Sequence, residues 1–180
     1  EKYRLIRHDF LCKYYQINYD IPNILNNNNL TDSNINISIK HNIQLISKWY
    51  KKGSLYDVIK ASCKDTPFNY KIIIRIAIQI AKGMSFLHNE CHVCHGYLKS
   101  RNVLFDDNMN IKVTDIGLIS LKRCMSVMLT DINFNGYWND ADYFLGNKID
   151  YPCDVWAYGF ILYELNTKKI PYVIKNNNND

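Results

Sequence analysis

The sequence predicts a mixed α+β fold, and three patterns of apolar residues lead to that prediction. Two runs, residues 10–19 and 43–50, are rich in aromatic and β-forming side chains, which is typical of strands. Apolar residues recur at three- and four-residue steps over 68–89, which indicates a helix with one buried face. Residues 155–165 are almost wholly apolar, so we expect a helix that is buried on all sides.

The first part of the chain is predicted to hold a helix end, a loop and the two strands. Between the strands, residues 23–38 are polar and rich in Asn. Such a segment cannot bury enough apolar area to offset the entropy lost on ordering, so we expect a disordered surface insert. After the second strand, Lys51-Lys52-Gly53 is predicted to turn into a short helix over 54–60, with Ser54 as its N-cap.

The helix over 68–89 is the clearest single element, although Gly83 costs it about 1 kcal/mol relative to Ala. Two short strands are expected around Asp106-Asp107-Asn108, a combination that is typical of a hairpin turn. Residues 118–150 show few periodic signals and are predicted to form a long functional loop. Residues 176–180 are predicted to begin a low-complexity insert or linker.

The bulk composition narrows the class of protein. Hydrophobic residues make up 47% of the 180 residues and charged residues 22%, which suffices for one buried core. The formal net charge is +5, but the Lys and Arg residues are scattered, which argues against nucleic-acid binding. No stretch reaches the roughly 18 apolar residues of a membrane span, so no membrane segment is expected in this piece.

One pair of motifs carries the strongest functional signal. The first is the run His95-Gly96-Tyr97-Leu98-Lys99-Ser100-Arg101-Asn102, and the second is Thr114-Asp115-Ile116-Gly117. They resemble the catalytic loop H-R-D-L-K-x-x-N of protein kinases and the metal-binding D-F-G that follows it. The chain therefore resembles the protein kinase superfamily, and in particular its tyrosine-kinase-like group.

Four further segments resemble kinase motifs in the family's order. They are residues 5–8 (L-x-R-H before strand 4), 45–55 (strand 5 and the hinge), 76–88 (I-A-x-x-I-A-x-G-M-x-Y-L-H) and 154–172 (D-V-W-S-F-G through E-L to P-Y). The resemblance implies a partial bilobal kinase fold over 1–175, in which 1–50 form the end of the N-lobe and the hinge and 51–175 part of the mainly helical C-lobe. The Gly-rich loop, the strand-3 Lys and the helix-C Glu are expected before Glu1, and the last helices after Asp180.

The catalytic loop departs from the family at the position that matters most for chemistry. The family's catalytic Asp, which accepts the proton of the substrate hydroxyl, is Tyr97 here, and the preceding Arg is Gly96. A Tyr with a pKa near 10 is neutral at pH 7 and offers no carboxylate. The degenerate loop of His95, Gly96, Tyr97 and Lys99 therefore contains no intact catalytic set, which favours an inactive domain.

The cofactor positions are better preserved, and the resemblance implies ATP and Mg²⁺ as their ligands. Asn102 and Asp115 match the family's metal ligands, and their oxygen atoms suit Mg²⁺. The alternative, that Asn102 and Asp115 only stabilise the loop by hydrogen bonds, stays open. For the nucleotide, the resemblance implies Ser47 as gatekeeper, the backbone of Lys48 and Tyr50 at the adenine edge, and Leu104 beneath the ring.

The resemblance also assigns architectural roles and a compartment. His95 and Ile116 would occupy two positions of the hydrophobic spines, and Asp154 would hold the backbone of the catalytic loop. A kinase-like fold implies a reducing, cytoplasmic location, so the six Cys residues are expected to be free thiols. The run Cys91-His92-Val93-Cys94-His95 also fits the haem pattern C-x-x-C-H or a pair of metal ligands, but the loop already accounts for His95.

Two functions follow from this sequence. The first is a pseudokinase that serves as a scaffold or allosteric regulator of protein partners or of a linked catalytic domain in the same chain, with ATP and Mg²⁺ bound. In this respect the chain is similar to the kinase-homology regions of receptor guanylyl cyclases. The alternative is a divergent active serine/threonine kinase of the tyrosine-kinase-like group, which transfers the ATP γ-phosphate to protein hydroxyls.

Overall fold

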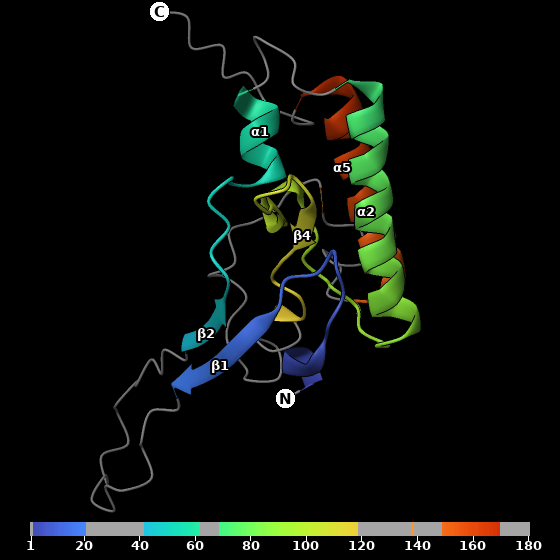
Figure 1. Ribbon diagram of the computed structural model, residues 1–180. Helices are drawn as coiled ribbons and strands as arrows, with labels where there is room; N and C mark the ends of the chain where they lie inside the picture. The colour runs from blue at the N-terminus through green and yellow to red at the C-terminus, as the bar shows by residue number, and fades with distance from the viewer. Residues whose placement is uncertain (1, 21–41, 62–68, 119–137, 139–148, 170–180) are drawn as a thin grey trace, which may run out of the picture.

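The computed structural model describes residues 2–20, 42–61, 69–118, 138 and 149–169 (Figure 1). The predictions for residues 23–38 and 176–180, and most of that for 118–150, lie outside these residues. The fold is α+β, as predicted. Its elements in chain order are η1 (Lys2–Leu5), β1 (Tyr14–Asp20), β2 (Asn42–Ser47), α1 (Leu55–Ala61), α2 (Tyr70–Asn89), η3 (Ser100–Asn102), β3 (Val103–Phe105), β4 (Ile111–Val113) and α5 (Tyr151–Thr167).

The strands that the structure describes form two antiparallel pairs. Strands β1 and β2 pair with Ile17 opposite Leu45, and β3 and β4 pair with Leu104 opposite Lys112. The predicted turn of the second hairpin is confirmed: Asp106 Oδ1 accepts hydrogen bonds from the backbone N–H groups of Asn108 and Asn110 at 3.0 and 2.9 Å. This is the way in which an Asp side chain stabilises a tight turn.

The prediction that the first strand starts at residue 10 is wrong, because residues 10–12 pair with a different strand. The backbone N–H of Val113 donates to the carbonyl of Phe10 at 2.9 Å, and the N–H of Cys12 donates to the carbonyl of Val113 at 2.8 Å. These bonds fix residues 10–12 beside β4, so β1 begins only at Tyr14. A run of β-forming residues indicates extended backbone but not its partner.

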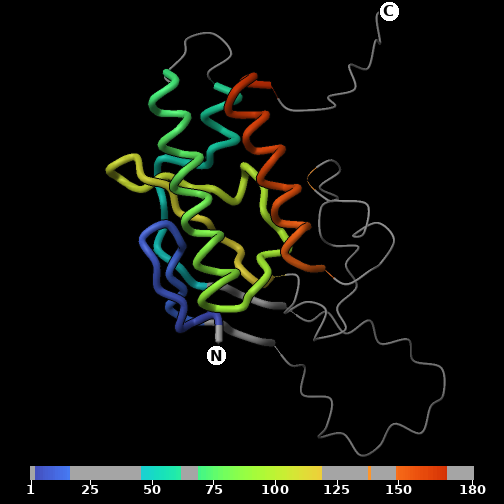
Figure 2. Tube along the Cα trace, turned by 90° about the vertical axis from the view of Figure 1, so that its right-hand side faces the viewer, coloured from blue at the N-terminus to red at the C-terminus, as the bar shows by residue number. Residues whose placement is uncertain are grey.

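The two long helices, α2 and α5, run side by side in both Figure 1 and Figure 2. Helix α2 begins two residues later than predicted, because Asn69 is its N-cap and accepts from the N–H of Ile72 at 3.0 Å. The hydroxyl of Tyr158 on α5 donates to the carbonyl of Ala77 on α2 at 3.0 Å. Gly83 also has a structural reason, since a Cβ there would lie only 3.0 Å from Leu11 Cδ2.

The prediction that the helix over 155–165 is buried on all sides is wrong. One face of α5 is buried and includes Ala157, Ile161 and Leu165. The opposite face is apolar but exposed: Val155 is 64% exposed and Trp156 is 49% exposed. An all-round apolar helix needs packing partners on every side. Within the described part of the chain, α5 packs on α2 and the loop that follows α2, which cover one side only.

The short helix α1 is capped as predicted. Ser54 Oγ accepts from the N–H of Asp57 at 3.2 Å, and Asp57 Oδ2 accepts from the N–H of Ser54 at 3.1 Å. This reciprocal pair is a capping box. The guanidinium of Arg101 lies 3.5 Å from the ring centroid of Tyr56, which joins α1 to the loop around η3.

Two further findings bear on the expectations for membrane segments and for the cysteines. Among the helices that the structure describes, none combines the length and apolarity needed to cross a bilayer. Four of the six cysteines fall in described segments, and all four are free thiols: Cys12, Cys91, Cys94 and Cys153.

Candidate functional site

The candidate site is built around the loop that follows α2, and Asp154 of α5 anchors that loop. The Asp154 carboxylate is 2% exposed and accepts the backbone N–H groups of His95 and Gly96, each at 2.8 Å. His88 Nε2 of α2 lies 2.8 Å from the same carboxylate. The predicted role of Asp154 as the holder of the loop backbone is confirmed.

The environment of Asp154 also fixes its charge. Burial acts to raise the pKa of this carboxyl, but the hydrogen bonds from His88, Gly96 and His95 outweigh it and hold the pKa below its usual value. Asp154 is therefore an ionised group in the core, with its oxygens accepting hydrogen bonds from α2 and the loop. A buried carboxylate of this kind stabilises one loop conformation only while its donors stay in place.

His95 lies at the centre of the loop and is a neutral, fully buried imidazole. Its Nδ1 accepts the backbone N–H of Tyr97 at 3.1 Å, so its Nε2 carries the proton and donates to the carbonyl of Thr114 at 2.8 Å. Burial lowers the pKa of His95. His95 is 0% exposed and Ile116 1% exposed, and Ile116 belongs to the main apolar cluster, so both side chains lie in the core as predicted for spine positions.

Tyr97 stands where the family has its catalytic Asp, and its side chain points inward rather than to solvent. Tyr97 is only 9% exposed, and the Lys99 ammonium lies over its ring at 4.0 Å from the centroid. Burial lowers the pKa of Lys99 to about 8, although the Asp115 carboxylate acts in the opposite direction. The site thus pairs a cation with an aromatic face at the position where a kinase would present a carboxylate.

The two predicted metal ligands, Asn102 and Asp115, come from segments that the backbone ties together. The N–H of Thr114 donates to the carbonyl of Asn102 at 2.9 Å, and Asn102 Nδ2 donates to the carbonyl of Tyr97 at 2.7 Å. Asp115 has a φ of 62°, in the left-handed region that non-Gly residues rarely occupy. Such uncommon backbone conformations gather at functional sites.

Tyr14 is a site residue that sequence analysis missed. Its hydroxyl oxygen accepts the backbone N–H of Ile116 at 3.0 Å and so holds the segment that carries Asp115. Burial raises the pKa of Tyr14, and the Asp115 carboxylate adds to this effect. No sequence signal could have found this contact, because the two residues lie 102 positions apart and the strand pattern does not specify a partner.

The residues predicted to contact adenine lie along the segment from β2 to β3. Ser47 ends β2, Lys48 is exposed, and Tyr50 is 9% exposed. The N–H of Phe105 donates to the carbonyl of Gly53 at 3.1 Å, and Ser54 forms an isolated bridge with Leu104. The structure therefore brings Leu104 to the turn that follows Tyr50, while the roles of these residues toward a nucleotide stay predictions.

Glu164 is a second buried carboxyl on α5 that sequence analysis missed. It is 0% exposed, and burial raises its pKa to about 7, an effect that the nearby Ser100 hydroxyl and Trp138 indole only partly offset. Ser100 belongs to η3, directly after Lys99. Helix α5 thus carries two acids beneath the loop, of which one is stabilised as an anion and the other is not.

The run Cys91-His92-Val93-Cys94-His95 also contacts Asp154, the residue that anchors the loop. Cys94 Sγ lies 3.3 Å from Asp154 Oδ2 and 3.2 Å from the carbonyl of Asp150, and burial raises the pKa of the Cys94 thiol. His95 faces Thr114, as described above. Over the residues that the structure describes, no three His, Cys, Asp or Glu side chains are grouped so that they could hold a metal ion.

Three features define the protein-kinase class of fold. They are an H-x-x-L-K-x-x-N loop, an aspartate on a long helix that holds this loop, and a D-x-G segment beside it. Residues 18–179 match the family described as protein tyrosine and serine/threonine kinase. The chain belongs to this family.

Relatives agree with that assignment. The chain is 37% identical over 131 residues to a probable serine/threonine-protein kinase of Dictyostelium discoideum. It is 32% identical over 128 residues to the serine/threonine-protein kinase STY46 of Arabidopsis thaliana, and 35% identical over 135 residues to the protein BRASSINOSTEROID INSENSITIVE 1 of the same plant. These matches cover 73%, 71% and 71% of this chain but only 14%, 22% and 11% of the relatives, so the chain spans a small part of their length.

Proposed function

We propose that this kinase domain binds ATP with Mg²⁺ but transfers phosphate poorly or not at all, and so acts as a pseudokinase. The observation that carries the proposal is the state of Tyr97: its ring is buried beneath the Lys99 ammonium, 4.0 Å from the ring centroid. A catalytic base must instead present an acceptor atom to the hydroxyl from which it takes a proton.

The residues present fit a nucleotide and its metal. Asn102 donates from its Nδ2 to the carbonyl of Tyr97, so its Oδ1 is the atom that would ligate the metal. Asp115 supplies a carboxylate, and both donors are of the hard oxygen type that Mg²⁺ prefers. Lys99, beside Asp115, is the cation that would meet the terminal phosphate, and Leu104 and the backbone of Lys48 and Tyr50 would hold the adenine.

Phosphoryl transfer consists largely of positioning and charge stabilisation, and the bound metal would supply much of the latter. What this chain lacks is a group to orient the substrate hydroxyl and accept its proton. General-base assistance of this kind is typically worth about 10²–10⁴ in rate. The domain would therefore keep its nucleotide as a structural or regulatory ligand.

A second candidate is an active serine/threonine kinase that uses a base from another part of the protein. The comparisons support it directly, because the relatives include proteins named as serine/threonine kinases. The retained Asn102, Asp115 and Lys99 are compatible with it. A regulatory role toward protein partners or a linked catalytic domain, and a cytoplasmic location, belong to the first candidate as proposals.

The nucleotide site is tested by thermal unfolding of the full-length protein with ATP alone, with Mg²⁺ alone and with both. We expect stabilisation only with both ligands, because Asp115 would hold the metal and the metal would supply positive charge to the phosphates; at 100 times Kd the gain would be about 2.7 kcal/mol. Asp115→Ala should abolish the shift. Glu90→Ala, which removes an exposed acid beyond the end of α2, should retain it.

A shift that Asp115→Ala leaves unchanged would contradict the proposed metal site. No shift in any of the conditions would contradict nucleotide binding as a whole. Transfer of the γ-phosphate by variants at Tyr97 separates the two candidates.

A further inference from the structure

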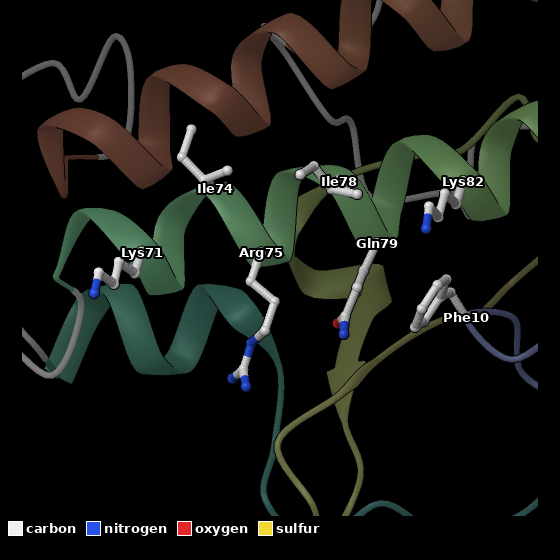
Figure 3. A pocket seen from close by; sticks show the side chains of 7 residues that line it. All are labelled: Phe10, Lys71, Ile74, Arg75, Ile78, Gln79 and Lys82. Carbon is white, nitrogen blue, oxygen red and sulfur yellow. The ribbon is translucent and has the colours of Figure 1, made fainter.

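A groove along the outer side of α2 belongs to neither the loop nor the nucleotide residues. Its volume is about 360 Å³. In Figure 3 the lining side chains from Lys71 to Lys82 project from α2, and Phe10 approaches from the segment before β1. The lining residues are Phe10, Lys71, Ile74, Arg75, Ile78, Gln79 and Lys82.

The groove carries positive charge without any negative charge. Three of its seven lining residues are cations, Lys71, Arg75 and Lys82, and none is acidic. Helix α2 contains no Asp or Glu along its 20 residues. The cations recur at steps of four and seven, so they form one stripe along the helix, about 16 Å long at 1.5 Å per residue.

Apolar side chains lie beside this stripe. Ile74 is 39% exposed and Ile78 is 49% exposed, although the inner face of α2 buries Ile76 and Ile80 completely. Phe10 is partly buried and packs against the core, with its ring at one end of the groove. The groove therefore offers aliphatic contact and positive charge on the same surface.

One wall of the groove is fixed in place. Gln79 Nε2 donates to Asn110 Oδ1 at 3.0 Å, and Gln79 Oε1 accepts the N–H of Ile111 at 3.1 Å. The Arg75 guanidinium lies 3.4 Å from the carbonyl of Met109. These bonds attach the β3–β4 hairpin to α2, so the groove is formed before any partner arrives.

We propose that this groove docks an acidic segment of a partner protein, one in which Asp or Glu side chains alternate with aliphatic ones. The carboxylates meet Lys71, Arg75 and Lys82, and the aliphatic side chains cover Ile74 and Ile78. A single-stranded nucleic acid needs a series of aromatic platforms, and the groove has only Phe10. A membrane-surface helix needs a broad apolar face, whereas that of α2 is already in the core.

The test uses the full-length protein and a labelled 14-residue helical peptide. In this probe the second Glu follows the first by four residues and the third follows the second by seven, to match the spacing of the cations. Leu residues lie between the Glu positions. A peptide of the same composition in scrambled order is the control for charge alone. Binding is followed by fluorescence anisotropy at low and at physiological salt.

Two variants remove the charge and the apolar contact separately. Lys71→Glu with Lys82→Glu should weaken binding of the probe by about fivefold to tenfold, as expected from the loss of two exposed ion pairs. Ile78→Ser should weaken it by about threefold, since part of one aliphatic contact is lost. The matched control, Lys52→Glu with Lys60→Glu, makes the same change of net charge at exposed residues that do not line the groove, and it should leave binding unchanged.

The unfolding midpoint of each variant is measured alongside, so that a loss of binding is compared only among folded proteins. The proposal is overturned if the probe does not bind, if the scrambled peptide binds equally well, or if the control pair weakens binding as much as the groove pair. It is also overturned if single-stranded DNA or phosphatidylserine vesicles bind through Lys71 and Lys82 while the peptide does not.

Discussion

The two ends of the loop from His95 to Asn102 differ in how many features of a kinase catalytic loop they retain. At His95 and Gly96, the backbone is held by the buried Asp154 carboxylate at 2.8 Å, and His95 reaches Thr114 at the same distance. At Tyr97 and Lys99, two residues further on, the side chains pack against each other. The difference teaches that the scaffold of this loop and its chemistry are separable: the Tyr97 backbone still donates to His95, while the Tyr97 side chain offers no carboxylate.

The largest expected effect is on the scaffold. Asp154→Ala leaves the N–H groups of His95 and Gly96 buried without their acceptor, and it should lower the free energy of unfolding by about 3–5 kcal/mol. Urea unfolding of the full-length protein checks this. Glu90→Ala, at an exposed position, should change stability by less than about 0.5 kcal/mol.

The same anchor has a pH dependence of known sign. Because the folded pKa of Asp154 is lowered, its contribution is present above the ordinary pKa of an aspartate and is lost as the pH falls through the folded value. An Asp154→Ala protein whose loss of stability is the same at pH 3 and at pH 7 would contradict an ionised anchor.

Glu164 should show the opposite dependence. Burial raises its folded pKa from 4.5 to about 7, so the folded protein binds the extra proton and stability falls as the pH rises between these values. The fall should be about 3 kcal/mol, and Glu164→Gln should remove most of it. Unfolding measured at pH 5 and pH 8 for both proteins checks this; an equal fall in Glu164→Gln would assign the effect elsewhere.

A smaller effect is expected where the D-x-G segment meets the N-terminal turn. Gly117 has a φ of +71°, and a Cβ there would collide with the ring of Tyr3. Gly117→Ala should therefore lower the free energy of unfolding by about 2 kcal/mol, from backbone strain and displaced packing. Differential scanning calorimetry of the full-length protein measures it.

Gly159 is the matched control for that substitution. It lies within α5, and a Cβ added there would have no atom within 4 Å. Gly159→Ala should stabilise the protein by about 1 kcal/mol, because Ala is the better helix former. If both substitutions destabilise equally, the close approach of Gly117 to Tyr3 has no special role.

The sequence predicted those features whose causes are local. The helix over 68–89 follows from its apolar period, the α1 cap from Ser54, and the hairpin turn from Asp106 and its neighbours. It did not predict that residues 10–12 would pair with β4, nor the exposed face of α5, because both depend on which elements lie alongside.

The candidate site was predictable to the same extent. The resemblance to the kinase family implied the role of Asp154 as the anchor of the loop and identified the place of Tyr97. Tyr14 and Glu164 were missed because each acts through a contact with a residue distant in sequence, and neither stands in a pattern that signals such a contact. The basic stripe on α2 was present in the sequence at helical spacing, but the exposure of its neighbours Ile74 and Ile78 depends on which elements pack against α2.

The central claim is that this domain keeps the scaffold of a kinase and lacks its base. The most direct test measures transfer of labelled γ-phosphate from ATP by the full-length protein as wild type, Asp115→Ala and Tyr97→Asp. We expect the wild type to be no faster than Asp115→Ala, and Tyr97→Asp to be faster by about 10²–10⁴. A wild-type rate that Asp115→Ala abolishes and Tyr97→Asp does not raise would contradict the claim and establish an active kinase.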